Sequence, residues 1–103
     1  MEEGLRFAAI DIGSNAIRLL FTRVIINSQP IFIKESLIRM PLRLGQDAFR
    51  FGKITDKTAK NLIETIKGFS SLIKAYDPIA VRACATSAMR SSSNGINLVE
   101  KII

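Results

Sequence analysis

The sequence contains no histidine and only one cysteine, Cys84, in 103 residues. A disulfide within the chain needs two cysteines, and a Cys/His zinc site needs several such ligands, so both are excluded here. A Ser-His-Asp triad is excluded because it requires histidine. Disulfide-rich scaffolds, zinc-finger-like modules and serine hydrolases are therefore not classes to which this chain can belong by itself.

Long apolar runs are also missing, because Thr22, Arg23 and Lys34 interrupt the hydrophobic stretches. These interruptions come too early for a membrane span. Residues 1–4 are acidic, and no signal-type apolar region follows them. The sequence therefore predicts a soluble, cytoplasmic protein that has no membrane partner.

The composition predicts a folded chain with a basic surface. Hydrophobic residues make up 48% of the sequence and there are only three prolines, which is typical of a globular protein. The length suits one small domain or a piece of a larger one. Fifteen Lys and Arg against nine Asp and Glu leave a net charge of +6, which favours polyanionic partners. A piece of a protein need not share the charge of the whole, so charge alone leaves the partner open.

The hydrophobic pattern predicts three strands joined by short turns, a long helix, a fourth strand and a final helix. Thr55 is the expected N-cap of the long helix, and Asp77 before Pro78 is its expected end. Because a helix separates the fourth strand from the others, this strand should run parallel to a neighbour. Residues 39–52 are expected to be an extended segment and loop. The expected strands are 6–12, 16–26, 31–38 and 79–85, and the final helix is 94–103.

The stretch from residue 8 to residue 20 holds the candidate site. A buried charge is costly, so Asp11 should lie at the mouth of the first strand. Backbone N–H groups of Gly13, Ser14 and Asn15 could converge on an anion. A carboxylate for hydrated Mg²⁺ beside such a turn suits phosphoryl transfer. An ordinary hairpin turn explains the same residue types, and the residues alone leave both interpretations open.

Two motifs resemble one known family. Asp11-Ile12-Gly13-Ser14-Asn15, followed by Ile17-Arg18-Leu19, resembles the first phosphate-binding loop of the exopolyphosphatase and guanosine pentaphosphate phosphohydrolase (Ppx/GppA) family. Ala85-Thr86-Ser87-Ala88-Met89-Arg90, followed by Asn94-Gly95, resembles that family's second conserved segment. The resemblance implies an α/β, ribonuclease-H-like (actin-like ATPase) fold, with residues 1–103 forming the N-terminal part of the phosphatase domain.

The same resemblance implies roles for five residues. Asp11 would help to hold the metal ion, Mg²⁺ or a similar divalent cation. Gly13, Ser14 and Asn15 would contact phosphate oxygens, and Arg90 would add positive charge. The position of Arg90 also follows from the rule that α/β sheets bind ligands beyond the carboxyl ends of parallel strands; a structural salt bridge is the other interpretation. The pattern departs from the family at Ala16, where many relatives have serine.

The predicted function is that of an exopolyphosphatase-type hydrolase, which releases terminal phosphate from polyphosphate or guanosine pentaphosphate. In the family, the glutamate that activates water and the second glycine-rich loop lie downstream of residue 103. The chain alone is therefore expected to be inactive. The alternatives are a non-catalytic phosphate- or nucleotide-binding module and a kinase-like relative of the same superfamily. Asn15 after Gly13 and Ser14 favours the hydrolase.

Further expectations concern partners and surface charges. The lysines of the long helix are interpreted as a solvated face, so no nucleic acid partner is expected. The fourth strand should be an open edge that promotes self-association, with a dimer in the parent protein. Arg50 is interpreted as a solvated charge, whereas the roles of Arg39 and Arg43 stay open.

Overall fold

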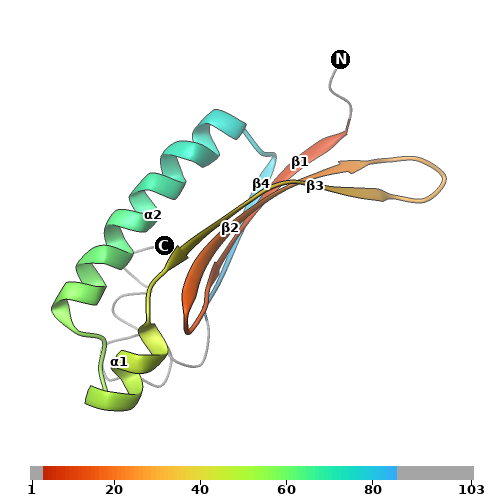
Figure 1. Ribbon diagram of the computed structural model, residues 1–103. Helices are drawn as coiled ribbons and strands as arrows, with labels where there is room; N and C mark the ends of the chain where they lie inside the picture. The colour runs from red at the N-terminus through yellow and green to blue at the C-terminus, as the bar shows by residue number, and fades with distance from the viewer. Residues whose placement is uncertain (1–3, 86–103) are drawn as a thin grey trace.

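The computed structural model describes residues 4–85, which form a mixed four-stranded sheet and two helices (Figure 1). The strand order in the sheet is β3-β2-β1-β4. β2 is antiparallel to both β1 and β3, and β4 is parallel to β1. The predicted meander, crossover helix and parallel fourth strand are confirmed, while the final helix predicted at 94–103 lies outside the described residues. The elements are β1 (Leu5–Ile12), β2 (Ala16–Ile25), β3 (Ile31–Pro41), α1 (Leu44–Phe51), α2 (Asp56–Tyr76) and β4 (Ala80–Ala85).

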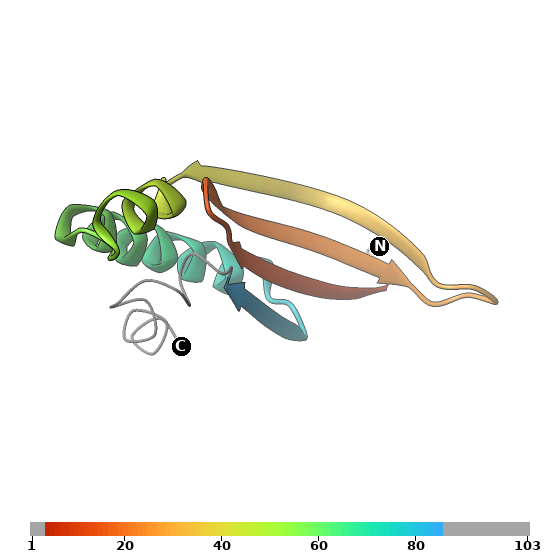
Figure 2. The same ribbon diagram turned by 90° about the horizontal axis from the view of Figure 1, so that it is seen from below.

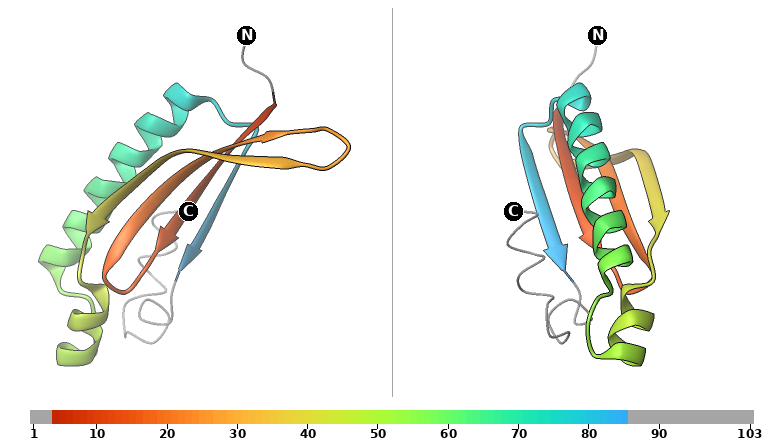
Figure 3. Two further views of the ribbon diagram at one scale, coloured as in Figure 1. Left: turned by 45° about the vertical axis from the view of Figure 1, so that its right-hand side comes forward. Right: turned by 90° about the vertical axis from the view of Figure 1, so that its left-hand side faces the viewer.

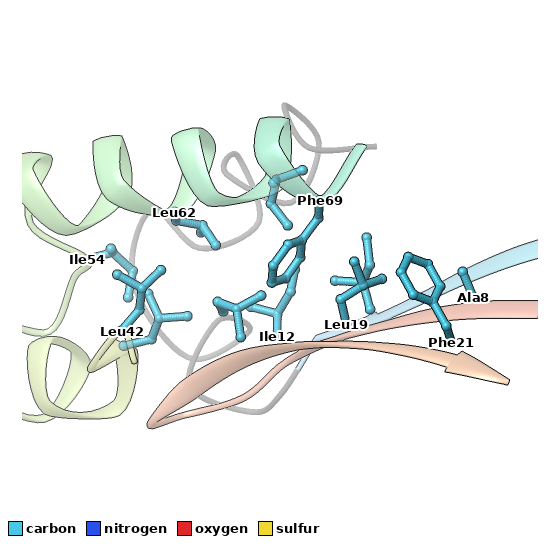
Figure 4. Close-up of a cluster of buried hydrophobic side chains, with 12 residues drawn as sticks. Ala8, Ile12, Leu19, Phe21, Leu42, Ile54, Leu62 and Phe69 are labelled. Carbon is cyan, nitrogen blue, oxygen red and sulfur yellow. The ribbon is translucent and has the colours of Figure 1, made fainter. Parts of the chain in front are cut away.

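The core lies between α2 and one face of the sheet (Figures 2 and 3). Strand alternation sends every second side chain to this face, and the β1–β2 register places Ile10 beside Leu19 and Ile12 beside Ile17. Apolar side chains of α2 at helical spacing pack down onto them (Figure 4). The buried residues of α2 are Leu62, Ile66 and Phe69.

The ends of α2 are set by local chemistry, as the sequence predicted. Thr55 is the N-cap, and its side-chain oxygen accepts a hydrogen bond from the Thr58 amide at 3.3 Å. Asp77 ends the helix in the left-handed region, at φ 57°, and its amide donates to the Ile73 carbonyl at 2.8 Å. Although α2 has 21 residues, neither it nor α1 is long and apolar enough to cross a membrane.

The expectation for residues 39–52 was wrong in part. The extended segment is present, because β3 continues to Pro41, but the loop is replaced by the helix α1. Only Leu44 of α1 is buried, and Phe49 is 92% exposed. The hydrophobic pattern of α1 is therefore too short to indicate a helix from the sequence. The available signal was Gly52, which ends α1 in the left-handed region and donates its amide to the Ala48 carbonyl at 3.0 Å.

Candidate phosphate-binding site

The candidate site lies where β1 turns into β2, at the carboxyl ends of the two parallel strands. β1 ends at Ile12, and Ala85 at the end of β4 is its partner in the ladder. Gly13, Ser14 and Asn15 form the β1–β2 turn at this edge, next to α1 (Figure 3). The fold therefore places the turn at the edge where α/β sheets bind ligands.

The turn is closed by a short hydrogen bond between its first residue, Gly13, and Ala16, the first residue of β2. The Gly13 amide donates to the Ala16 carbonyl at 2.9 Å, and a Cβ atom at position 13 would lie only 2.9 Å from that same oxygen. Glycine is thus required here by close approach of the backbone. Because the Gly13 amide already has an acceptor, the donors that the turn offers to an anion are the amides of Ser14 and Asn15. Within residues 4–85, neither of these amides donates to a backbone carbonyl.

Residues around the start of α1 hold the carbonyl groups of the turn. The Gly45 amide donates to the Ser14 carbonyl at 2.9 Å, and the Leu42 amide donates to the Asn15 carbonyl at 3.1 Å. In a trans peptide the carbonyl and the following N–H point in opposite directions, and the described residues contain no cis peptide. The Asn15 amide, which follows the Ser14 carbonyl, therefore points away from α1.

Asp11 lies near the end of β1, on the sheet face opposite to the core. Its Oδ2 atom is 3.4 Å from Nη1 of Arg18, and the two side chains are 50% and 46% exposed. Arg18 belongs to the first motif but was not predicted as a site residue. The signal was available in the hairpin: pairing across a turn of this length puts residue 18 directly opposite residue 11.

The sheet register extends this charge cluster across three strands, β1, β2 and β3. Asp11 pairs with Cys84 of β4 and with Arg18 of β2, and Arg18 pairs with Arg39 of β3. Direct cross-strand partners share one face, so Arg39, whose role the sequence left open, lies in the same row as Asp11. Arg43 is the exposed N-cap residue of α1, and the exposed Arg50 lies in the last turn of that helix.

The donor set around Asp11 limits how a metal ion could bind. Within residues 4–85 there is no group of three or more Asp, Glu, Cys or His side chains able to hold a metal. A single accessible carboxylate does fit Mg²⁺ in one common mode, in which the ion keeps several waters and shares phosphate oxygens of the substrate. A hydrated cation shared between Asp11 and a bound phosphate would fit this mode, and it would compete with Arg18 for the carboxylate.

Two expectations near the site have different outcomes. Arg90 and the rest of its motif beyond Ala85 lie outside the described residues, so its role stays a prediction. Ala16 is only 1% exposed, although strand alternation puts it on the same side of β2 as Arg18. A serine hydroxyl at this position would need a partner in the interior.

The fold and the position of the turn define the chain as a partial actin-like ATPase domain, of which the solved Ppx/GppA-family structures are examples. The Ppx/GppA family member of Aquifex aeolicus superposes with a TM-score of 0.83 and 26% identity, over 95% of this chain and 31% of that chain. The exopolyphosphatase of Cytophaga hutchinsonii superposes with a TM-score of 0.80 and 30% identity, over 94% of this chain and 30% of that chain.

Sequence comparison leads to the same family. Exopolyphosphatase 1 of Mycobacterium tuberculosis is 29% identical over 98 residues, which are 95% of this chain and 28% of the relative. No family model matches the chain. The predicted family is nevertheless confirmed by these relatives: the chain corresponds to the N-terminal part of Ppx/GppA-family proteins. It spans about 30% of the length of the relatives that it matches.

Proposed function

We propose that this chain is the N-terminal, phosphate-binding part of an exopolyphosphatase-type hydrolase that releases terminal phosphate from polyphosphate. Guanosine pentaphosphate is the second candidate substrate, because the family is defined by both activities. The observation that carries the proposal is the β1–β2 turn. The carbonyls of Ser14 and Asn15 accept hydrogen bonds from Gly45 and Leu42, while the amides of Ser14 and Asn15 have no backbone acceptor among the described residues. Phosphate oxygens are suitable acceptors for such amides.

The charge distribution supports a polyanionic ligand. Arg18 and Arg39 follow Asp11 across the face of the sheet opposite to the core, and the whole chain carries +6. A planar guanidinium can donate two hydrogen bonds to one phosphate. Arg90 is proposed to add another positive charge to the same edge. Together these groups would attract and orient a chain of phosphates, and would raise its rate of encounter.

Asp11 is proposed as the residue that holds Mg²⁺ or a similar divalent cation jointly with the bound phosphates. When bound, the cation would neutralise charge on the transferring phosphoryl group. With the cation present, Arg18 would be free to exchange its partner Asp11 for a phosphate oxygen. The cytoplasmic location expected from the sequence also stays a prediction.

A non-catalytic phosphate-binding module is the second candidate function. One observation favours it: residues 4–85 contain no group of three or more Asp, Glu, Cys or His side chains that could hold a metal ion for catalysis. The two candidates share the binding step and differ in turnover. Binding is therefore the first property to test.

Isothermal titration of tripolyphosphate against the wild-type chain, Asn15→Pro, which removes the Asn15 backbone N–H, and Arg90→Ala tests the binding step. Loss of one charge-assisted contact should weaken affinity by about ten- to a hundredfold. Asn61→Ala and Arg50→Ala are the matched controls, because both residues are exposed and lie on α2 and α1, respectively. If all five proteins bound tripolyphosphate with equal affinity and differed only in melting temperature, the turn would be an ordinary hairpin connection and not a phosphate-binding site.

A further inference from the structure

We propose that Gly45 and Asp47 are positioning residues, which hold the peptide group between Ser14 and Asn15 in one orientation. The orientation directs the Asn15 amide away from α1, toward the place where a ligand would bind. As a statement about affinity, this inference rests on the proposed phosphate-binding function. As a statement about the turn itself, it can be tested without any ligand.

The first step is the hydrogen bond from the Gly45 amide to the Ser14 carbonyl, at 2.9 Å. The Ser14 carbonyl and the Asn15 amide belong to the same rigid peptide plane. Rotation of this plane would break the bond to Gly45 at the same time as it moved the Asn15 amide. The direction of a ligand-binding donor in the turn is thus coupled to a residue that is distant in sequence.

The second step is the space at position 45. A Cβ atom at Gly45 would lie 3.0 Å from the Ser14 Cβ and 3.5 Å from the Ser14 carbonyl oxygen. The first distance is shorter than the ~3.5–4.0 Å of an ordinary carbon–carbon contact. Glycine therefore fits this position without strain, whereas an added side chain would require Ser14 to shift by a few tenths of an ångström.

The third step is the attachment of α1 itself. This helix buries only Leu44, so packing holds it weakly. On its other side, Oδ2 of Asp47 accepts hydrogen bonds from the Thr55 amide at 3.0 Å and from the Thr55 hydroxyl at 2.7 Å. Thr55 is the N-cap of α2, and α2 packs on the sheet. Asp47 therefore fixes α1 relative to the body of the protein.

The protonation state of Asp47 agrees with this role. Burial alone would raise the pKa of Asp47, but hydrogen bonds from the Thr55 amide, the Thr55 hydroxyl and the Thr58 hydroxyl outweigh that effect and lower it. The carboxyl group is therefore ionised at neutral pH and acts only as an acceptor. The whole path runs from Thr55 through Asp47 and α1 to Gly45 and the Ser14 carbonyl.

Amide hydrogen exchange of the full chain, followed by NMR, tests the positioning directly. Asp47→Ala should accelerate exchange of the Gly45 amide by about tenfold relative to the core amides of α2, because one charge-assisted anchor of α1 is lost. It should also shift the Asn15 amide resonance. Asp47→Asn, which keeps an oxygen acceptor, is the milder variant if Asp47→Ala does not fold. Asp56→Ala is the matched control, since Asp56 is exposed in the first turn of α2.

Selective acceleration at Gly45 supports the proposal. Equal acceleration of Gly45 and the core amides would mean that Asp47 only stabilises the fold, and would overturn it. An unchanged Asn15 resonance in Asp47→Ala would also overturn it.

Titration of tripolyphosphate then connects positioning to binding. Gly45→Ala should lower affinity about tenfold, whereas Gly68→Ala, where an added Cβ meets no atom within 4 Å, should leave affinity unchanged. Wild-type affinity in Gly45→Ala would overturn the proposal. If the wild-type chain itself does not bind tripolyphosphate, the proposed function fails, and the exchange data still decide whether Gly45 and Asp47 position the turn.

Discussion

Replacing Gly13 by alanine should destabilise the protein strongly, because the new methyl group would collide with backbone. The added Cβ would lie 2.9 Å from the Ala16 carbonyl oxygen, well inside ordinary contact distance. This oxygen belongs to the first residue of β2, where Ala16 is 1% exposed and the next residue, Ile17, is fully buried. The oxygen cannot move away without opening the turn and displacing the core.

Two contributions set the magnitude. Overpacking against a rigid neighbour costs about 1–3 kcal/mol, and loss of the hydrogen bond from the Gly13 amide to Ala16 adds about 0.5–1.5 kcal/mol. The free energy of unfolding should therefore fall by about 1.5–4.5 kcal/mol, a large share of the ~5–15 kcal/mol of a typical domain. The melting temperature should decrease by at least ~6 °C for a chain of this size.

Urea unfolding followed by far-UV circular dichroism measures this change. Gly68→Ala is the matched control, since it makes the same chemical change inside α2, where nothing lies within 4 Å of the added Cβ. Alanine is the better helix former by about 1 kcal/mol, so this control should be as stable as wild type or more so. A Gly13→Ala protein as stable as wild type would refute the close-approach argument.

Three further predictions concern pH, activity and assembly. Burial and the 2.6 Å hydrogen bond to Glu35 raise the pKa of Tyr76 from 10.0 to about 12. The resulting stabilisation of the folded state should be complete below pH 10 and should disappear as the pH rises from 10 to 12. Tyr76→Phe should remove this pH dependence from alkaline unfolding curves. The 103-residue chain should release no phosphate from polyphosphate with Mg²⁺, and the reading fails if release occurs and is abolished by Asp11→Asn. Because β4 is an edge of the described sheet, the chain should self-associate, and Val81→Lys should reduce this in light scattering; a wild-type monomer at high micromolar concentration would contradict it.

The sequence by itself determined the elements whose signals are local. A short apolar run predicted β1, alternating apolar residues predicted β2, and Thr55 and Asp77 predicted both ends of α2. Caps and hydrophobic patterns act over a few neighbouring residues. The crossover between β3 and β4 then required a parallel strand. Two short motifs in order were enough for the family, which the relatives confirm. Asp11 was correctly expected at the mouth of its strand.

Only the tertiary structure decided how the candidate site is assembled. The segment that holds the turn was expected to be a loop, because its contacts are main-chain hydrogen bonds from Leu42 and Gly45, and such bonds leave no side-chain pattern in a sequence. The row from Asp11 through Arg18 to Arg39 exists only once three strands pair in one register. Donor directions and charge neighbours depend on contacts between residues far apart in the chain, and local propensity carries no information about those contacts.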